Sequence, residues 1–190
     1  MSIIIGYKDG GKVYMACDTG RTLDEYIFSD DTETGMNVFH LPNGVMCGAT
    51  CYSVKQAIQT NGQWFDGLDG ELTKKFITRE FVAPLYDKLD GLGLIDDNDG
   101  SQFSGAILLA KNDRLFCIDS DFSVHLITKF CVIGKGFDYA VPRIILHNDE
   151  PIDSMLYNAL SDAGVYLRRV REPFYMFTTD STSKQQLRRK

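Results

Sequence analysis

The sequence lacks the features of a membrane or secreted protein. None of its apolar runs approaches the roughly 18–20 consecutive apolar residues that a membrane span requires. The opening run, from Met1 to Gly6, is too short for the core of a signal peptide and carries no basic leader. We therefore expect a cytoplasmic protein that has no membrane partner.

Basic charge is also scarce. The 190 residues include 20 Lys and Arg against 26 Asp and Glu, which gives a formal net charge of -6. Dense basic runs occur only at residues 168–171 and 188–190. A surface that tracks nucleic-acid phosphates needs clustered Lys and Arg. We interpret the two runs as a solvated helix face and a chain end, and we expect no nucleic-acid partner.

Cysteine and histidine show no disulfide or metal-binding pattern. The cysteine count is odd, no Cys-x-x-Cys occurs, and the three histidines lie far apart. These features predict reduced thiols, mostly buried, and no metal site. There is no P-loop, and the Gly134-Lys135-Gly136 turn lacks the third glycine of a dinucleotide-binding loop, so no cofactor is expected. The cysteines are Cys17, Cys47, Cys51, Cys117 and Cys131.

What the sequence does contain is an ordered series of hydrophobic segments. Glycine-containing turns divide residues 2–18 and 38–50 into two β-hairpins. The polar stretch 19–37 between them is predicted to be mostly loop, with a short strand at 26–28. Helical periodicity or capping residues predict helices from Ser53 toward Trp64, over 71–89, after Gly136, and after Asp149 or Asp153. Further strands are predicted at 105–110, 115–119, 125–126, 129–133 and 174–178.

Strands and helices therefore come in separate groups, which is typical of an α+β protein. Two stacked sheets, each covered on its outer face by a helix pair, would bury all of these segments. The predicted fold is a four-layer αββα sandwich in a single domain over residues 1–180, followed by a basic, flexible tail at 181–190.

Three stretches resemble a known family. Residues 2–18 begin with a hydroxyl residue, have Gly6 four positions later, and end the second strand with Asp18. Residues 132–140 read Val-Ile-Gly-Lys-Gly-Phe-Asp-Tyr-Ala, and residues 107–119 read as strand, turn and a second strand leading to aspartate. In this order and spacing the chain resembles proteasome β-subunits and their bacterial two-component relative, which are N-terminal-nucleophile (Ntn) hydrolases. The resemblance covers nearly the whole chain and implies the same αββα sandwich.

The resemblance implies that Ser2 is the nucleophile. In this family the hydroxyl of the N-terminal residue attacks the substrate, and its α-amine, with a pKa near 8, serves as the general base. Ser2 becomes N-terminal only when Met1 is removed, which is common before a small residue. If Met1 is retained, the nitrogen of Ser2 is an amide and cannot accept a proton.

The resemblance also gives Asp18 a role and exposes a gap. Asp18 matches the aspartate that orients the family's site; as an alternative, it caps the loop that follows its strand. The family's lysine belongs on the strand before residue 39, where this chain has Met36, Asn37 and Val38. Because that lysine lowers the effective pKa of the nucleophile, its loss implies loss of most activity.

Two further site residues follow from the same comparison. Lys135 replaces the serine of the family's glycine turn and would reach back to supply the missing charge; as an alternative, it is an exposed lysine at a helix start. The backbone N–H that receives the developing negative charge falls on Cys51, or on Gly48 if the alignment slips. Either N–H would serve, although the Cys51 side chain would narrow the approach.

Two functions remain open at this point. The first is a self-compartmentalised peptidase that acts on peptides or proteins and assembles as a homo-oligomeric ring. The second is a proteasome-like subunit that keeps the assembly surface but has degenerate or weak catalytic machinery. The missing lysine favours the second, because a catalytic unit loses most of its activity when one member is absent.

Overall fold

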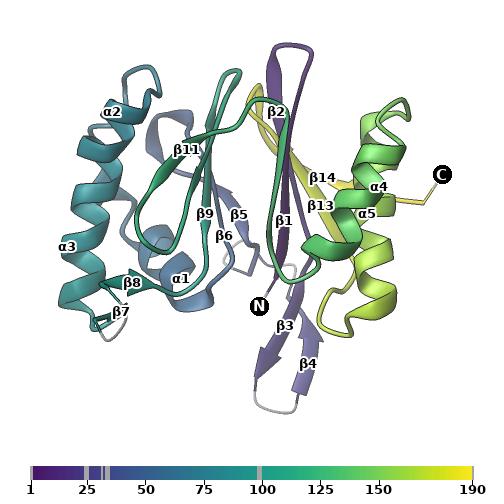
Figure 1. Cartoon of the computed structure of the whole chain (residues 1–190), viewed down its shortest axis with the longest axis horizontal. Helices are drawn as coiled ribbons and strands as arrows, with labels where there is room; N and C mark the ends of the chain where they lie inside the picture. The colour runs from purple at the N-terminus through teal and green to yellow at the C-terminus, as the bar shows by residue number, and fades with distance from the viewer. Residues whose placement is uncertain (1, 24–25, 31, 33–34, 98–99, 190) are drawn as a thin grey trace.

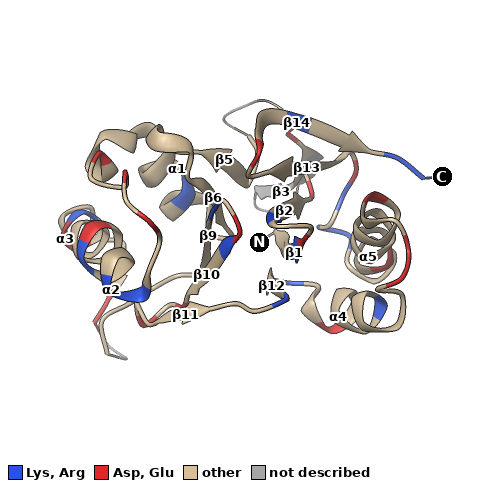
Figure 2. Ribbon diagram, turned by 90° about the horizontal axis from the view of Figure 1, so that it is seen from above, with Lys and Arg blue, Asp and Glu red and all other residues tan. Residues whose placement is uncertain are grey.

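Two five-stranded antiparallel sheets lie face to face in the computed structural model, which describes residues 2–23, 26–30, 32, 35–97 and 100–189. Helices cover the outer face of each sheet, so the layers follow the order helices, sheet, sheet, helices (Figure 1; Figure 2). The predicted αββα sandwich is confirmed.

The first sheet holds both the start and the end of the chain. Its strands in spatial order are β12 (Phe130–Gly134), β1 (Ile3–Asp9), β2 (Lys12–Cys17), β13 (Phe174–Thr178) and β14 (Ser181–Leu187). Side chains of β1 alternate between two apolar layers: Ile3 and Ile5 face the helices α4 (Phe137–Leu146) and α5 (Ile152–Tyr166), whereas Ile4 faces the second sheet. The strand is therefore a continuous apolar run, because both of its faces are buried.

The second sheet packs against the other helical layer. Its strands in spatial order are β11 (Val124–Leu126), β10 (Arg114–Ile118), β9 (Ile107–Lys111), β6 (Met46–Ala49) and β5 (Val38–His40). The covering helices are α1 (Tyr52–Thr60), α2 (Lys74–Ile77) and α3 (Ala83–Gly91), and a π-helical turn (Thr78–Val82) joins the last two. Buried aromatic and aliphatic side chains from these helices fill the layer between them and the sheet.

Two small hairpins and two short 3-10 helices complete the described chain. The strands β3 (Gly20–Leu23) and β4 (Tyr26–Ser29) pair with each other, as do β7 (Ile95–Asp96) and β8 (Gln102–Phe103). The 3-10 helices are η1 (Pro42–Gly44) and η2 (Gly62–Phe65). No helix in the described part of the chain is long and apolar enough to cross a membrane.

The differences from expectation lie where residues are polar. Within the stretch 19–37, predicted as mostly loop, the short strand expected at 26–28 is confirmed as β4, whereas its partner β3 was not predicted. Residues 181–187, expected within a flexible tail, form β14 and pair with β13. This strand is exposed along nearly all of its length, so it carries no hydrophobic alternation that would reveal it.

The contact between Gly134 and Ser2 yields the first prediction. Gly134→Ala should lower the free energy of unfolding by about 2–4 kcal/mol, because the added Cβ would lie 1.9 Å from the Ser2 carbonyl oxygen at a φ of +91°. Gly10→Ala is the matched control: φ is +56° there and nothing lies within 4 Å, so only the left-handed cost of about 1–2 kcal/mol applies. Urea denaturation measures both losses, and equal losses would contradict the contact.

Candidate functional site

Ser2 sits directly before β1, between two neighbouring strands. The next residue, Ile3, pairs with Gly134 on β12, and Ile4 pairs with Cys17 on β2. Ser2 is only 6% exposed, and its carbonyl oxygen occupies the space that a side chain at position 134 would need. Ser2 is therefore held inside the sandwich, and Met1, on whose removal the predicted nucleophile depends, lies outside the described residues.

Asp18 binds the residue that follows Ser2. One carboxylate oxygen, Oδ1, accepts a hydrogen bond from the N–H of Ile3 at 3.0 Å, and Oδ2 accepts one from the N–H of Gly20 at 3.0 Å. The side chain is completely buried. Desolvation raises the pKa of Asp18 to about 7, although the N–H donors partly oppose this rise. The carboxyl group thus titrates near neutral pH, well above the range of an ordinary aspartate.

Asn37 is one of the three residues, with Met36 and Val38, among which the resemblance predicts the family's lysine. Asn37 is buried, and its Nδ2 donates a hydrogen bond to the main-chain oxygen of Asp18 at 3.3 Å. The main-chain carbonyl of Asn37 accepts a hydrogen bond from the N–H of Ala49 at 3.0 Å, which ties Asn37 to the end of β6. Asn37 therefore fills the position structurally and brings no positive charge to it.

Sequence reasoning missed the buried lysine of this region, Lys55 on α1. Its side chain is 0% exposed, its Nζ donates a hydrogen bond to the carbonyl of Gly35 at 3.2 Å, and it lies 4.8 Å from the centre of the Tyr52 ring. Burial, followed by repulsion from Arg21, lowers the pKa of Lys55 to about 8. Cys17, the residue before Asp18, is among the groups that act electrostatically on this amine.

A signal for Lys55 was present in the sequence. In the run Val54-Lys55-Gln56-Ala57-Ile58, helical spacing places Lys55 on the same face as the buried Ile58. A charged side chain on an apolar helix face is exceptional, because Lys is almost never fully buried without a partner. Arg21 lies over the same Tyr52 ring and also donates to the Gly35 carbonyl, so two cations converge on one oxygen.

Lys135 follows Gly134, the glycine that makes room for the Ser2 carbonyl. It is exposed in the turn between β12 and α4, and its neighbours Gly134 and Gly136 both have positive φ values. Within the described residues, no hydrogen bond or ion pair joins Lys135 to Asp18. No described contact therefore supports Lys135 as the source of the missing positive charge, and this role stays a prediction.

Cys51 begins α1 and is the better of the two candidates for the backbone donor. It is the N-cap residue of that helix, and its N–H has no acceptor among the described residues. Gly48 instead lies inside β6, paired with Val38 and Leu108, so its backbone belongs to the sheet. Only Cys51 leaves an N–H at a helix start, where the aligned peptide dipoles favour an anion.

The thiol of Cys51 also has a distinct environment. Its Sγ lies 3.3 Å from the hydroxyl oxygen of Ser53. Partial burial tends to raise the pKa of this thiol, but hydrogen bonds from Ser53, Val54 and Ser104 outweigh burial and lower it. A cavity of about 560 Å³ lies alongside, with Ser53, Ser104 and Gly105 in its wall.

Metal chemistry finds no support in the side chains. Over the described ranges, no three His, Cys, Asp or Glu residues lie close enough together to hold a metal ion.

Comparisons with solved structures match this architecture along nearly the whole chain. Thiobacillus denitrificans BPH superposes with a TM-score of 0.74 at 18% identity, covering 99% of both chains. Anbu (ancestral β-subunit) from Yersinia bercovieri gives a TM-score of 0.68 at 17% identity, covering 97% of this chain and 86% of its own. Eukaryotic HslV from Trypanosoma brucei gives 0.63 at 14% identity, covering 93% and 98%.

The chain has the proteasome-like Ntn-hydrolase fold. The predicted resemblance to proteasome β-subunits is therefore confirmed for the fold. Comparisons with protein-family models and with curated protein sequences found no match. At these identities the proteasome-like fold is shared, while the site must be judged from this chain's own residues.

The raised pKa of Asp18 predicts an unusual pH dependence of stability. Between about pH 4 and pH 7 the folded chain keeps a proton on Asp18 that the unfolded chain releases. The stability that this group contributes is fully present below about pH 4 and is lost as the pH rises through about 7.

Asp18→Asn should remove this loss. Relative to the variant, the wild type should lose a few kcal/mol of unfolding free energy over that range, since each pKa unit corresponds to about 1.4 kcal/mol. Urea denaturation from pH 4.5 to 7.5 measures the slopes, and Asp113→Asn, at an exposed turn residue, is the control. Parallel slopes for the wild type and Asp18→Asn would contradict the raised pKa.

Proposed function

We propose that this chain is a subunit of a homo-oligomeric, proteasome-like assembly whose N-terminal site hydrolyses peptide bonds weakly or not at all. One observation carries the proposal. Asp18 is buried beside the nucleophile position, and within the described chain no Lys or Arg forms an ion pair with it.

The chemistry of an N-terminal nucleophile explains why this matters. The attacking hydroxyl must lose a proton, and a nearby positive charge favours the resulting anion. At this site Asn37 is neutral, Lys135 is exposed, and Asp18 titrates near neutral pH. The local field is therefore much weaker than a fixed carboxylate–ammonium pair would provide.

A second candidate function is an active peptidase that uses Ser2 after Met1 has been removed. Lys55 favours this function, because its buried amine interacts electrostatically with Cys17, the residue before Asp18. Lys55 also lies one helical turn after Cys51, and its N–H donates a hydrogen bond to the Cys51 carbonyl. With its pKa lowered to about 8, the amine still carries a positive charge in most molecules at pH 7. The positive charge near the nucleophile would then come from Lys55 on α1, and not from a lysine on the strand before residue 39.

An exposed apolar face supports the assembly. Among the residues whose exposure is described, most of the exposed large apolar side chains lie on α4 and α5, where Leu146 is 74% and Val165 is 75% exposed. Tyr139 and Tyr166 stack there with ring centroids 4.5 Å apart. Monomeric proteins rarely leave such a patch in water, and a second copy of the chain is the occupant that a homo-oligomer provides.

The two candidate functions differ in their response to Ser2→Ala. With removal of Met1 checked by intact mass, we expect the wild type and Ser2→Ala to release fluorophore from peptide substrates at the same low rate. We also expect no adduct with epoxomicin, with which Thiobacillus denitrificans BPH was solved in complex. Lys55→Met should likewise leave the rate unchanged.

The opposite pattern would establish the active peptidase. A wild-type rate at least about 100-fold above that of Ser2→Ala would show that Ser2 is a working nucleophile. An equal loss in Lys55→Met, with Lys135→Ala unaffected, would then assign the charge to Lys55. Retention of Met1 in the purified protein would exclude the peptidase, because the amine of Ser2 would be an amide.

The assembly is tested separately. Light scattering during size-exclusion chromatography should give a mass that is a multiple of 21.4 kDa. The double variant Leu146→Glu with Val165→Glu should dissociate it by placing charges in the buried interface. Leu126→Glu, at a residue of β11 that is 49% exposed, is the control and should stay assembled. A monomeric wild type would contradict the proposed assembly.

A further inference from the structure

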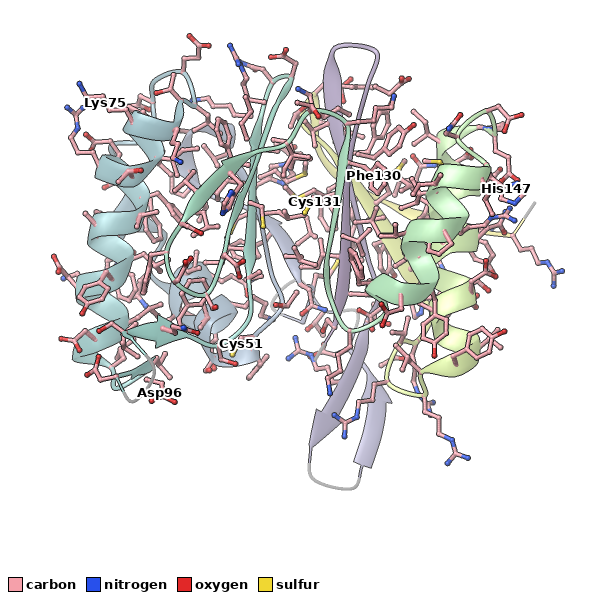
Figure 3. All side chains as sticks on the ribbon, viewed as in Figure 1. Cys51, Lys75, Asp96, Phe130, Cys131 and His147 are labelled. Atoms are coloured by element: carbon pink, nitrogen blue, oxygen red, sulfur yellow. The ribbon has the colours of Figure 1, made fainter. Side chains whose placement is uncertain are left out.

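Two cysteines face each other across the space between the sheets. Cys117 lies on β10 of the second sheet and Cys131 on β12 of the first. Both are half-buried and pack against the same inter-sheet core, while the neighbouring Phe130 points to the opposite side of β12, toward the helices (Figure 3).

The chain passes from one sheet to the other between the strands that carry these thiols. The connection from β11 to β12 crosses between the sheets within three residues: Ile127 N–H donates to the Leu115 carbonyl at 2.9 Å, and the Lys129 carbonyl accepts from Lys8 N–H at 2.8 Å. Cα atoms of β10 and β2 approach within 8 Å, whereas stacked sheets are usually about 10 Å apart.

A glycine permits this close approach. Gly6 is the β1 partner of Cys131, and a Cβ on it would lie 3.1 Å from side-chain atoms of Leu108 and Leu115 on the opposite sheet. A disulfide needs Cα atoms about 4.4–6.8 Å apart, and a close approach of the two sheets favours such a spacing.

The two thiols also interact with each other electrostatically. A hydrogen bond between them is the largest influence on each: it lowers the pKa of Cys131 and, together with burial, raises the pKa of Cys117. The carboxylate of Asp119 raises both. Cys131 is consequently the better thiolate of the pair, and Cys117 keeps the proton.

We propose that Cys117 and Cys131 form a redox-active dithiol that a peroxide oxidises to a disulfide joining the two sheets. This modification site is independent of the proposed function, since neither residue touches Ser2 or Asp18 in any described contact. It gives the sandwich a reversible covalent link at the edge where β11 leads into β12.

The reaction balances with a peroxide as the two-electron acceptor. The Cys131 thiolate attacks a peroxide oxygen, and an S–O bond forms as the O–O bond breaks. The other oxygen takes a proton from water and leaves as water from hydrogen peroxide, or as an alcohol from an organic hydroperoxide. The sulfur of Cys117 then attacks the sulfur of Cys131, the S–S bond forms, and the S–O bond breaks. The departing hydroxide takes the proton of Cys117 and leaves as water, so the pair loses two electrons and two protons in all.

The disulfide would act on the start of the chain through β12. This strand holds Ile3 through Gly134, whose missing side chain makes room for the Ser2 carbonyl. A link between residues 117 and 131 also closes a short loop and so reduces the freedom of the unfolded chain. We expect the oxidised form to melt several degrees above the reduced form.

The inference is tested by treating the full-length Cys51→Ala protein with hydrogen peroxide. This variant lacks the thiol of Cys51, which is also partly exposed and could react. Intact mass should fall by two hydrogen atoms, digestion should yield a linked peptide pair containing Cys117 and Cys131, and a reductant should reverse both. Cys117→Ser should instead accumulate a sulfenic acid on Cys131 that dimedone traps, and Cys131→Ser should form no linked peptide.

A second probe reports on the spacing of the thiols. Phenylarsine oxide, which bridges two neighbouring thiols, should form a one-to-one adduct with Cys51→Ala and lose it in either serine variant on that background. Oxidation of Cys117 or Cys131 without a linked peptide would overturn the proposal. The proposal would also be overturned if both thiols stayed reduced under peroxide conditions that readily oxidise a small dithiol to its disulfide. This would hold even if the protein formed the arsenical adduct.

Discussion

The hydrogen bonds that Asp18 accepts from Ile3 and Gly20 are the constraint on which the site depends. They tie the beginning of β1 to the end of β2 and to the start of the β3–β4 hairpin. A completely buried carboxyl group is costly unless its oxygens are satisfied, and two main-chain N–H donors provide that here. The position of Ser2 therefore follows from backbone geometry, and it is independent of any particular side chain at residue 2.

Because of the same arrangement, the carboxyl group of Asp18 is stabilised by N–H groups, whereas in a carboxylate–lysine pair it would be stabilised by a positive charge. N–H dipoles stabilise the ionised form of Asp18 only in part, which leaves its pKa near 7. Asn37 completes the hydrogen bonding around it without adding charge, while the buried charge of Lys55 enters from α1 and meets the Gly35 carbonyl. The two buried groups thus have pKa values displaced from their ordinary ranges, that of Asp18 upward and that of Lys55 downward.

The fold was more predictable than the site, for physical reasons. Strands such as β1 and β9 are covered on both faces, so they are continuous apolar runs that can be recognised without partners. The strand β14 is exposed along nearly all of its length, and its pairing with β13 comes from backbone contacts that leave little trace in the sequence. Lys55 was not predicted because the family's lysine lies on a strand, whereas the buried lysine of this chain lies on a helix.

Gly134 has a consequence for how such a chain can change over time. Because the main chain of Ser2 rests in the space above this glycine, its carbonyl anchors the residue, and no hydrogen bond of its hydroxyl occurs among the described contacts. Substitutions that abolish chemistry at position 2 can then accumulate without unfolding the sandwich. Loss of activity and loss of structure are uncoupled, so selection for assembly alone would preserve the whole scaffold around a silent nucleophile.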